Sequence, residues 1–110
     1  MTDITQAREV LVARILQGNG TASPVQRRAA FDNAGLAGPL RTLIDKVARY
    51  AYKVTDADIA AARASGVSED EIFELVVCAA IGQATRQYDT ARAALEAAAK
   101  GDEHAARDSR

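Results

Sequence analysis

The chain has 110 residues, with 14 basic and 15 acidic side chains and a formal net charge of −1 at pH 7. This length fits one domain with a small core, and the near-neutral charge excludes the broad positive field with which proteins bind phosphate backbones. Because 48% of the residues are hydrophobic and only 5% are aromatic, the composition predicts closely packed, Ala-rich helices and buried subunit faces.

The single Cys excludes an intrachain disulfide, which fits a reducing compartment. The sequence has no recognisable signal peptide and no apolar run near the roughly 20 residues of a membrane span. We therefore expect a cytoplasmic protein without membrane contact. Residues 1–100 are predicted to form a single helical domain, and the polar residues 101–110 a disordered tail.

Two helices are predicted in the first third of the chain. An apolar stripe at helical spacing indicates the first, over about residues 3–17. Ser23, with Pro24 next and Gln26 three residues on, is typical of a capped helix start with a capping box. We expect Val25 to lie on the inward face of this second helix.

A third helix is predicted to begin at Gly38-Pro39. Its apolar residues recur every three or four positions and so predict one buried face: Leu40, Leu43, Ile44, Val47 and Ala51. Tyr50 and Tyr52 lie near its end, where Tyr is commonly a half-buried ring with a solvated hydroxyl.

The fourth helix and the start of the fifth are joined by a sharp turn. Thr55 with Asp58 and Ser68 with Glu71 have the spacing of capping boxes. Gly66 between them predicts a left-handed residue that ends the fourth helix. Five helices and no strand pattern predict an all-α fold, a compact five-helix orthogonal bundle.

The fifth helix is predicted from Glu69 to about Lys100 and has two apolar faces. One face is made by Phe73, Val76, Ala80, Ala84, Tyr88, Ala91 and Leu95, and the other, with smaller residues, by Leu75, Cys78, Gly82 and Thr85. A mid-helix Gly costs about 1 kcal/mol relative to Ala, so Gly82 predicts the close approach of another backbone. The two faces predict a homo-oligomer that assembles through helix 69–100, and a partner protein stays an alternative.

Cys78 is the one candidate nucleophile. A reactive thiolate needs a helix N-terminus, a basic neighbour or a second Cys, whereas Cys78 is expected more than two turns into a helix among apolar residues. We interpret it as a small buried hydrophobe, with a catalytic thiol as the alternative.

Arg86 is the candidate ligand-binding residue of the fifth helix. It is interpreted either as solvated helix surface or as a holder of an anionic ligand or of a neighbouring subunit's carboxylate. In the second case Tyr50 and Tyr52 are expected to join it at a subunit interface.

The acids Glu69, Asp70, Glu71 and Glu74 are interpreted mainly as helix-start residues. Because the only His is His104, no metal site and no cofactor are expected. The tight Gly66 turn also has the spacing of a helix-turn-helix, but the acidic first turn of the second helix would repel phosphates. No nucleic-acid partner is therefore expected, and a DNA-binding regulator stays the second alternative.

Two segments carry a family resemblance: residues 54–58 (VTDAD) and 66–72 (GVSEDEI), supported by Arg86 and loosely by residues 46–49 (KVAR). Together they resemble the C-terminal helical unit of alkylhydroperoxidase-like proteins, the carboxymuconolactone decarboxylase superfamily. The resemblance implies an all-helical, oligomeric fold.

Active peroxidases of that superfamily carry a CxxC pair and a following His on the helix before such a Gly turn. The matching places here are near Ala51, Val54 and Asp58, and none of them is Cys or His. The resemblance therefore implies a member without the redox motif, which we expect to be a binding or accessory subunit. The alternative is an oxidoreductase acting on a hydroperoxide or a related small molecule through Cys78 or a subunit-interface site.

Overall fold

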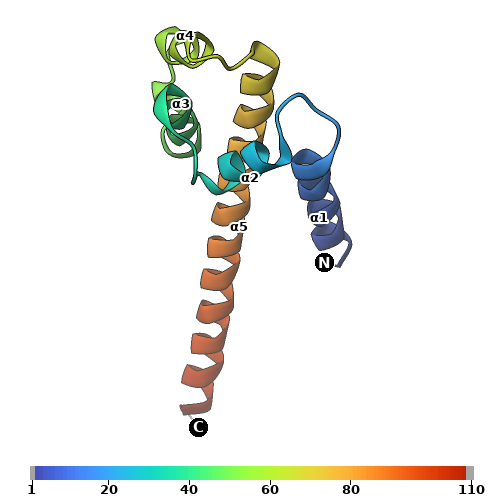
Figure 1. Cartoon of the computed structure of the whole chain (residues 1–110). Coiled ribbons are helices and arrows are strands. Elements are labelled where there is room, and N and C mark those ends of the chain that lie inside the picture. The colour runs from blue at the N-terminus through green and yellow to red at the C-terminus, as the bar shows by residue number, and fades with distance from the viewer. Residues whose placement is uncertain (1, 109–110) are drawn as a thin grey trace.

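The structure, a computed structural model, describes the backbone of residues 2–108 and the side chains of residues 4–102. The chain folds into α1 (Thr2–Gln17), α2 (Pro24–Asp32), α3 (Gly38–Arg49), the short 3-10 helix η1 (Ala51–Lys53), α4 (Asp56–Ala64) and α5 (Glu69–Asp108). The described residues contain five α-helices and no strand, which confirms the all-α prediction (Figure 1). Among them, no helix is long and apolar enough to cross a membrane.

The predicted helix starts are confirmed by their hydrogen bonds. The Ser23 hydroxyl accepts from the Gln26 amide at 3.1 Å, and Thr55 pairs with Asp58 in the same way. At the start of α5, the Glu71 amide donates to the Ser68 hydroxyl and the Ser68 amide donates to the Glu71 carboxylate, both at 3.2 Å. These boxes satisfy amides that a helix N-terminus leaves unpaired.

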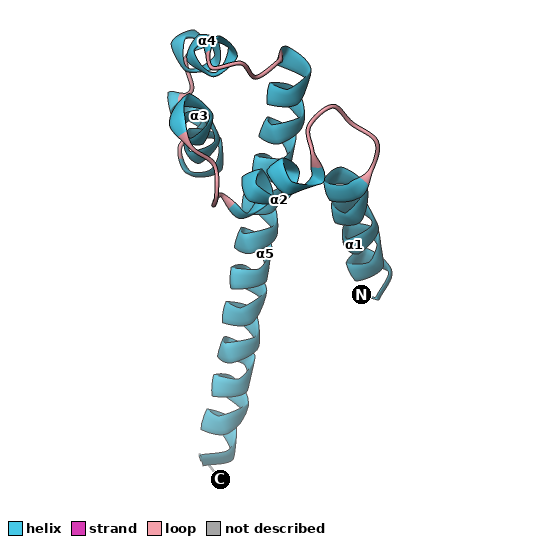
Figure 2. Cartoon of the chain, viewed as in Figure 1, coloured by secondary structure: helices cyan, strands magenta, loops and turns pink. Residues whose placement is uncertain are grey.

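Helix α5 is the element on which the other helices converge. α2 and α3 pack against its first half, α4 packs mainly on α3, and α1 contacts α2 and lies beside α5 (Figures 1 and 2). The largest fully buried side chains are Leu43, Ile44, Leu75 and Cys78. The core is therefore made where α2 and α3 meet the small-residue face of α5.

Val25 lies outside this core, so its predicted inward position is wrong. Its side chain is 80% exposed, whereas Arg27, Ala30 and Phe31 are the buried residues of α2. Val25 and Arg27 are two positions apart, so their side chains point in directions about 200° apart around the helix axis. The inward face of α2 therefore includes an Arg that apolar periodicity does not reveal.

The two predicted faces of α5 differ in burial. Leu75, Cys78 and Gly82 are buried, whereas the opposite side is open, with Phe73 70% exposed and Leu95 72% exposed. Val76 was predicted with the open side but is half-buried between the core clusters. We call the open side the outer face of α5: Phe73, Val77, Ala80, Ala84, Tyr88, Ala91 and Leu95.

α5 continues through Asp108, past the predicted end near Lys100. Gly101 has the lowest helix propensity there, and a lone Gly costs only about 1 kcal/mol. Residues 87–102 are all exposed, and beyond Asp89, which pairs with Arg8 of α1, α5 projects past the other helices (Figure 1). The side chain of His104 and residues 109–110 of the predicted tail lie outside the described part.

Candidate functional site

Cys78 lies in the interior, between α5 and the end of α1. It is 1% exposed, and its Sγ is 3.9 Å from the Ile15 carbonyl oxygen. Burial raises the pKa of the thiol, although the nearby Arg27 guanidinium opposes this shift. The thiol is therefore held in its protonated, poorly nucleophilic form.

Arg27 is the buried cation beside this thiol. It is 5% exposed and donates to three carbonyl oxygens: from Nε to Ala22 at 3.1 Å, and from Nη1 to Ile15 at 3.2 Å and Gly18 at 2.6 Å. Two of these carbonyls lie at the end of α1, where helix carbonyls need outside donors. Arg27 thus joins α2 to the end of α1 and the loop that follows.

Glu74 of α5 holds the other side of the same loop. Its two carboxylate oxygens accept from the amides of Thr21 at 2.8 Å and Ala22 at 2.6 Å. These backbone hydrogen bonds, with a smaller contribution from Arg27, lower the pKa of the carboxyl below its ordinary value. Figure 2 shows this loop arching between α1 and α2. Arg27 and Glu74 together fix it by its carbonyls and its amides.

The lowered pKa of Glu74 predicts a loss of stability in acid. A depressed carboxyl pKa stabilises the fold above the unfolded-state value, and this contribution disappears as the pH falls through the folded-state value. We expect Glu74→Gln to lower the free energy of unfolding by about 1 kcal/mol at neutral pH. Its stability should then converge on that of the wild type as the pH drops below 4.5, the ordinary value.

Urea unfolding at a series of pH values measures this convergence. Glu96→Gln removes the same charge from the exposed half of α5, where Glu96 only pairs with Arg92, and should leave the wild-type pH profile in place. A constant gap between Glu74→Gln and wild type across the whole pH range would contradict the role given to the carboxylate.

Arg86 also makes hydrogen bonds that hold the fold together. Its Nη1 donates to the Phe31 carbonyl oxygen at 2.6 Å, and its Nη2 donates to Gln83 at 3.1 Å. Phe31 lies in the last turn of α2, so the guanidinium caps that helix from α5. Arg86 is half-buried, and these two hydrogen bonds are directed at the same chain.

Tyr50 and Tyr52 lie after α3, on the exposed surface. Their ring centroids are 6.5 Å apart with perpendicular planes, and the Lys53 ammonium lies 5.0 Å from the Tyr50 ring and 5.9 Å from the Tyr52 ring. The Arg49 guanidinium is 5.5 Å from the Tyr50 ring. The two rings thus lie together among cations, whereas Arg86 bonds to α2, so Arg86 does not join the two Tyr residues within one copy of the chain.

Three acids at the starts of α4 and α5 have cap or ion-pair partners. The Glu71 carboxylate accepts from the Ser68 backbone amide at the start of α5, and the Glu69 carboxylate lies 3.0 Å from the Arg63 guanidinium. Asp58 accepts from Lys46 Nζ at 2.9 Å and from the Thr55 amide at 2.9 Å. These bonds lower the pKa of Asp58. Within the described residues, no group of three or more His, Cys, Asp or Glu could hold a metal ion.

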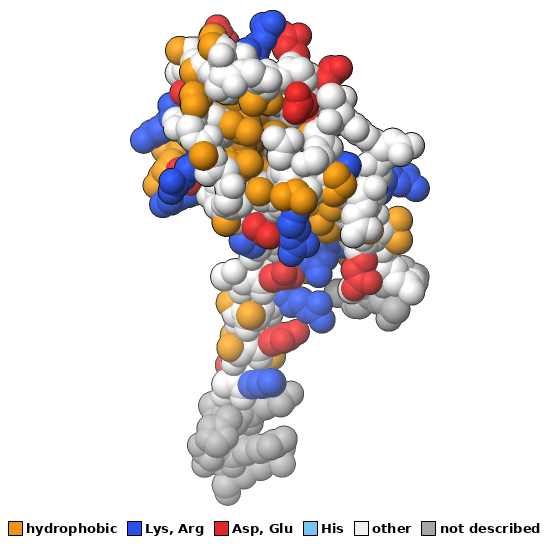
Figure 3. All heavy atoms as spheres, in the orientation of Figure 1, with side chains coloured by type: hydrophobic (Ala, Val, Ile, Leu, Met, Phe, Trp, Pro, Cys, Tyr) orange, Lys and Arg blue, Asp and Glu red, His pale blue; other side chains and the backbone are white. Residues whose placement is uncertain are grey.

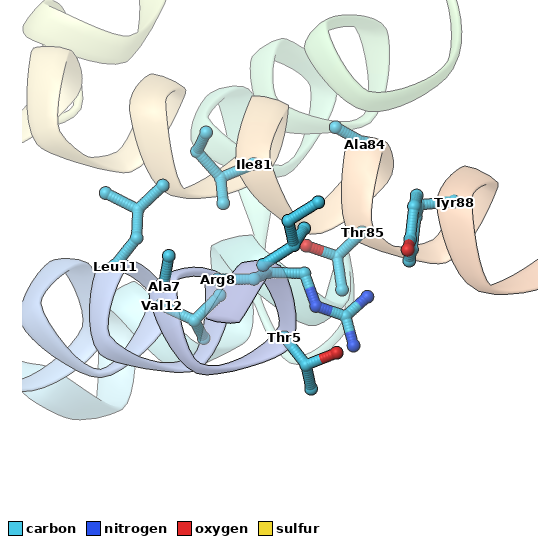
Figure 4. A pocket seen from close by; sticks show the side chains of 10 residues that line it. Thr5, Ala7, Arg8, Leu11, Val12, Ile81, Ala84, Thr85 and Tyr88 are labelled. Atoms are coloured by element: carbon cyan, nitrogen blue, oxygen red, sulfur yellow. The ribbon is translucent and has the colours of Figure 1, made fainter. Parts of the chain in front are cut away.

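An apolar groove lies between α1 and α5, a feature that the sequence did not predict. Figure 4 shows Ile81, Thr85 and Tyr88 extending from α5 toward α1. The groove has a volume of about 520 Å³, and its lining is Ile4, Thr5, Ala7, Arg8, Leu11, Val12, Ile81, Ala84, Thr85 and Tyr88. The apolar stripe of α1 was the available signal, but periodicity did not show that part of it stays open.

One ion pair closes the end of this groove. Arg8 of α1 lies 2.7 Å from the Asp89 carboxylate, and its guanidinium carbon is 5.0 Å from the centre of the Tyr88 ring. On the face seen in Figure 3, basic and acidic side chains are interspersed. The groove is therefore an apolar surface whose nearest cation is already paired.

These features define an all-helical protein with a buried thiol, an open apolar groove and an α1–α2 loop held by the hydrogen bonds of Arg27 and Glu74. Comparison with protein-family models, with curated proteins and with solved structures gives no match to the chain. The resemblance to alkylhydroperoxidase-like proteins therefore stays a prediction.

Proposed function

We propose that the chain is a small, self-associating, alkylhydroperoxidase-like helical protein that lacks the redox motif and serves as a binding or accessory subunit. The observation that carries this proposal is the contrast along α5. Its sole thiol is 1% exposed, whereas its outer face is apolar and open. An exposed apolar face can contact another protein surface, whereas a buried sulfur is not accessible to a substrate. Both observations favour a binding role.

Thiol-dependent peroxide reduction needs an attacking thiolate and a second thiol that resolves the intermediate. The chain has one Cys, and the Asp58 that occupies the matching His position is bonded to Lys46 and Thr55. The residues present therefore support a protein without this chemistry.

The direct test is hydroperoxide consumption in the presence of a dithiol reductant, with the wild type and Cys78→Ala assayed side by side. We expect neither protein to show turnover above the reductant alone. Turnover by the wild type that is abolished in Cys78→Ala would contradict the accessory role, provided circular dichroism shows that the variant is folded.

A second candidate is a one-Cys enzyme, and one observation favours it. A cleft of about 170 Å³ beside Cys78 is lined partly by the charged side chains of Arg14, Arg27 and Glu74. Alkylation of the native protein near neutral pH separates the candidates. We expect Cys78 to stay unmodified until the chain unfolds, whereas rapid modification of the folded protein would favour the enzyme.

A further inference from the structure

The outer face of α5 runs straight along the helix. Phe73, Ala84 and Leu95 are spaced eleven residues apart, close to three helical turns, so the face drifts by only about 20° over each interval. The interval from Phe73 to Leu95 is thus about 33 Å of helix. It lies on the side opposite Leu75 and Gly82, the residues that contact the core. A straight apolar face of this length fits another straight helix laid along it.

The chain itself offers such a helix. Residues 90–102 of α5 are exposed on every side and project past α1–α4, beyond Asp89, which pairs with Arg8 of α1 (Figure 1). They carry Ala91 and Leu95 on the outer face, and a helical segment without tertiary packing gains little stability from propensity alone. Each copy thus presents both an uncovered face on the body and a projecting segment of matching length.

We infer that two copies pair through α5 in antiparallel orientation, with a two-fold axis beside Ala84. This inference rests on the self-association in the proposed function and specifies its geometry. In this register Phe73 of one copy lies opposite Leu95 of the other, Val77 opposite Ala91, and Ala80 opposite Tyr88. Ala84 meets its own counterpart, as an isologous interface requires.

Size and charge both favour this register. Near the axis each large side chain faces a small one, so the helices approach closely, while Phe73 and Leu95 cover each other at the two ends. Arg92 of one copy falls within one turn of the position facing Glu74 of the other, on the same flank of the pair. A parallel pair would instead place Phe73 on Phe73 and would put Arg92 and Glu74 at opposite ends of the helix pair, out of reach of each other.

The same axis also accounts for the groove between α1 and α5. Rotation about it keeps both copies of α1 on one flank of the helix pair, beside Ile81 and Tyr88 of each α5. The exposed Leu11 and Ile4 are then covered by the second copy. The second copy is therefore the occupant of the groove.

Cysteine cross-linking tests the register. In a Cys78→Ser parent, Ala84→Cys should form a disulfide-linked dimer of doubled mass in most of the protein under mild oxidation, because a disulfide needs Cα atoms within about 7 Å. Thr90→Cys is the matched control: it is exposed on the same helix, about 120° from the outer face, and should stay uncross-linked.

A second cross-linking measurement tests the same register with a different pair of variants. Mixed Phe73→Cys and Leu95→Cys proteins should give a cross-linked heterodimer at least tenfold more abundant than either homodimer. If the parent sediments as an oligomer but Thr90→Cys cross-links as well as Ala84→Cys, or the mixture gives no heterodimer excess, the register is wrong and self-association stands. If the parent sediments as a monomer at micromolar concentration, both the register and the proposed self-association fail.

Discussion

Gly82→Ala should lower the free energy of unfolding by about 3 kcal/mol. A Cβ at this position would overlap the Phe31 carbonyl group, which is backbone of α2 and cannot move aside as a flexible side chain could. The same carbonyl accepts from Arg86, so a shift of α2 also strains that hydrogen bond. Urea unfolding followed by far-ultraviolet circular dichroism measures the loss.

Gly101→Ala is the matched control, because it makes the same change in the same helix where a Cβ would have nothing within 4 Å. It should leave stability unchanged or raise it, by up to about 1 kcal/mol, through helix propensity. If Gly82→Ala unfolded at the same urea concentration as Gly101→Ala, the close approach of α2 and α5 would be disproved.

Arg27→Ala should cost about 3 kcal/mol or more, because each buried acceptor left without a donor costs about 1–3 kcal/mol. Its side chain is the donor to three carbonyls, those of Ile15, Gly18 and Ala22, and buried acceptors left without donors are penalised strongly. Arg27→Lys should recover only part of the loss, because an ammonium cannot reproduce the forked geometry of the guanidinium. Thermal and urea unfolding give the measurement.

The neighbouring Arg28 provides the control for charge and composition. It is exposed and pairs with Asp32 one turn away, so Arg28→Ala should change stability by less than about 0.5 kcal/mol. Equal losses for the two variants would contradict the structural role of Arg27 at the end of α1.

Local signals in the sequence were sufficient to predict the capped starts of three helices and the turn between α4 and α5. Ser23, Thr55 and Ser68 are caps because their partners lie three residues away in the same segment. Gly66 has φ of 105°, as a left-handed turn residue requires. Gly82 was also predicted correctly, since an unfavourable residue in mid-helix calls for a packing reason.

Such local patterns could not predict the buried polar interactions of the fold. Arg27 and Glu74 look like ordinary surface charges in the sequence, and their partners are backbone groups of a loop up to 53 residues away. Only the folded structure shows that both side chains hydrogen-bond to the backbone of this loop. Arg86 was singled out correctly as unusual, but its acceptor on α2 lies 55 residues away and could not be identified.

Apolar periodicity likewise left the burial of α5 undecided. It revealed two apolar faces but could not tell which one the chain buries by itself. In the structure the small residues Cys78 and Gly82 face the core because α2 comes close there, while Phe73 and Leu95 stay open. The larger residues are thus the ones available for contact between copies.

Sedimentation equilibrium at micromolar concentration tests most directly whether the outer face of α5 joins copies of the chain. Ala84→Glu is the matched variant, because it places a charge at the centre of that face on an exposed position that the fold does not use. We predict a dimer or a larger oligomer for the wild type and a folded monomer for Ala84→Glu. A wild-type protein that sediments as a monomer would contradict the central claim.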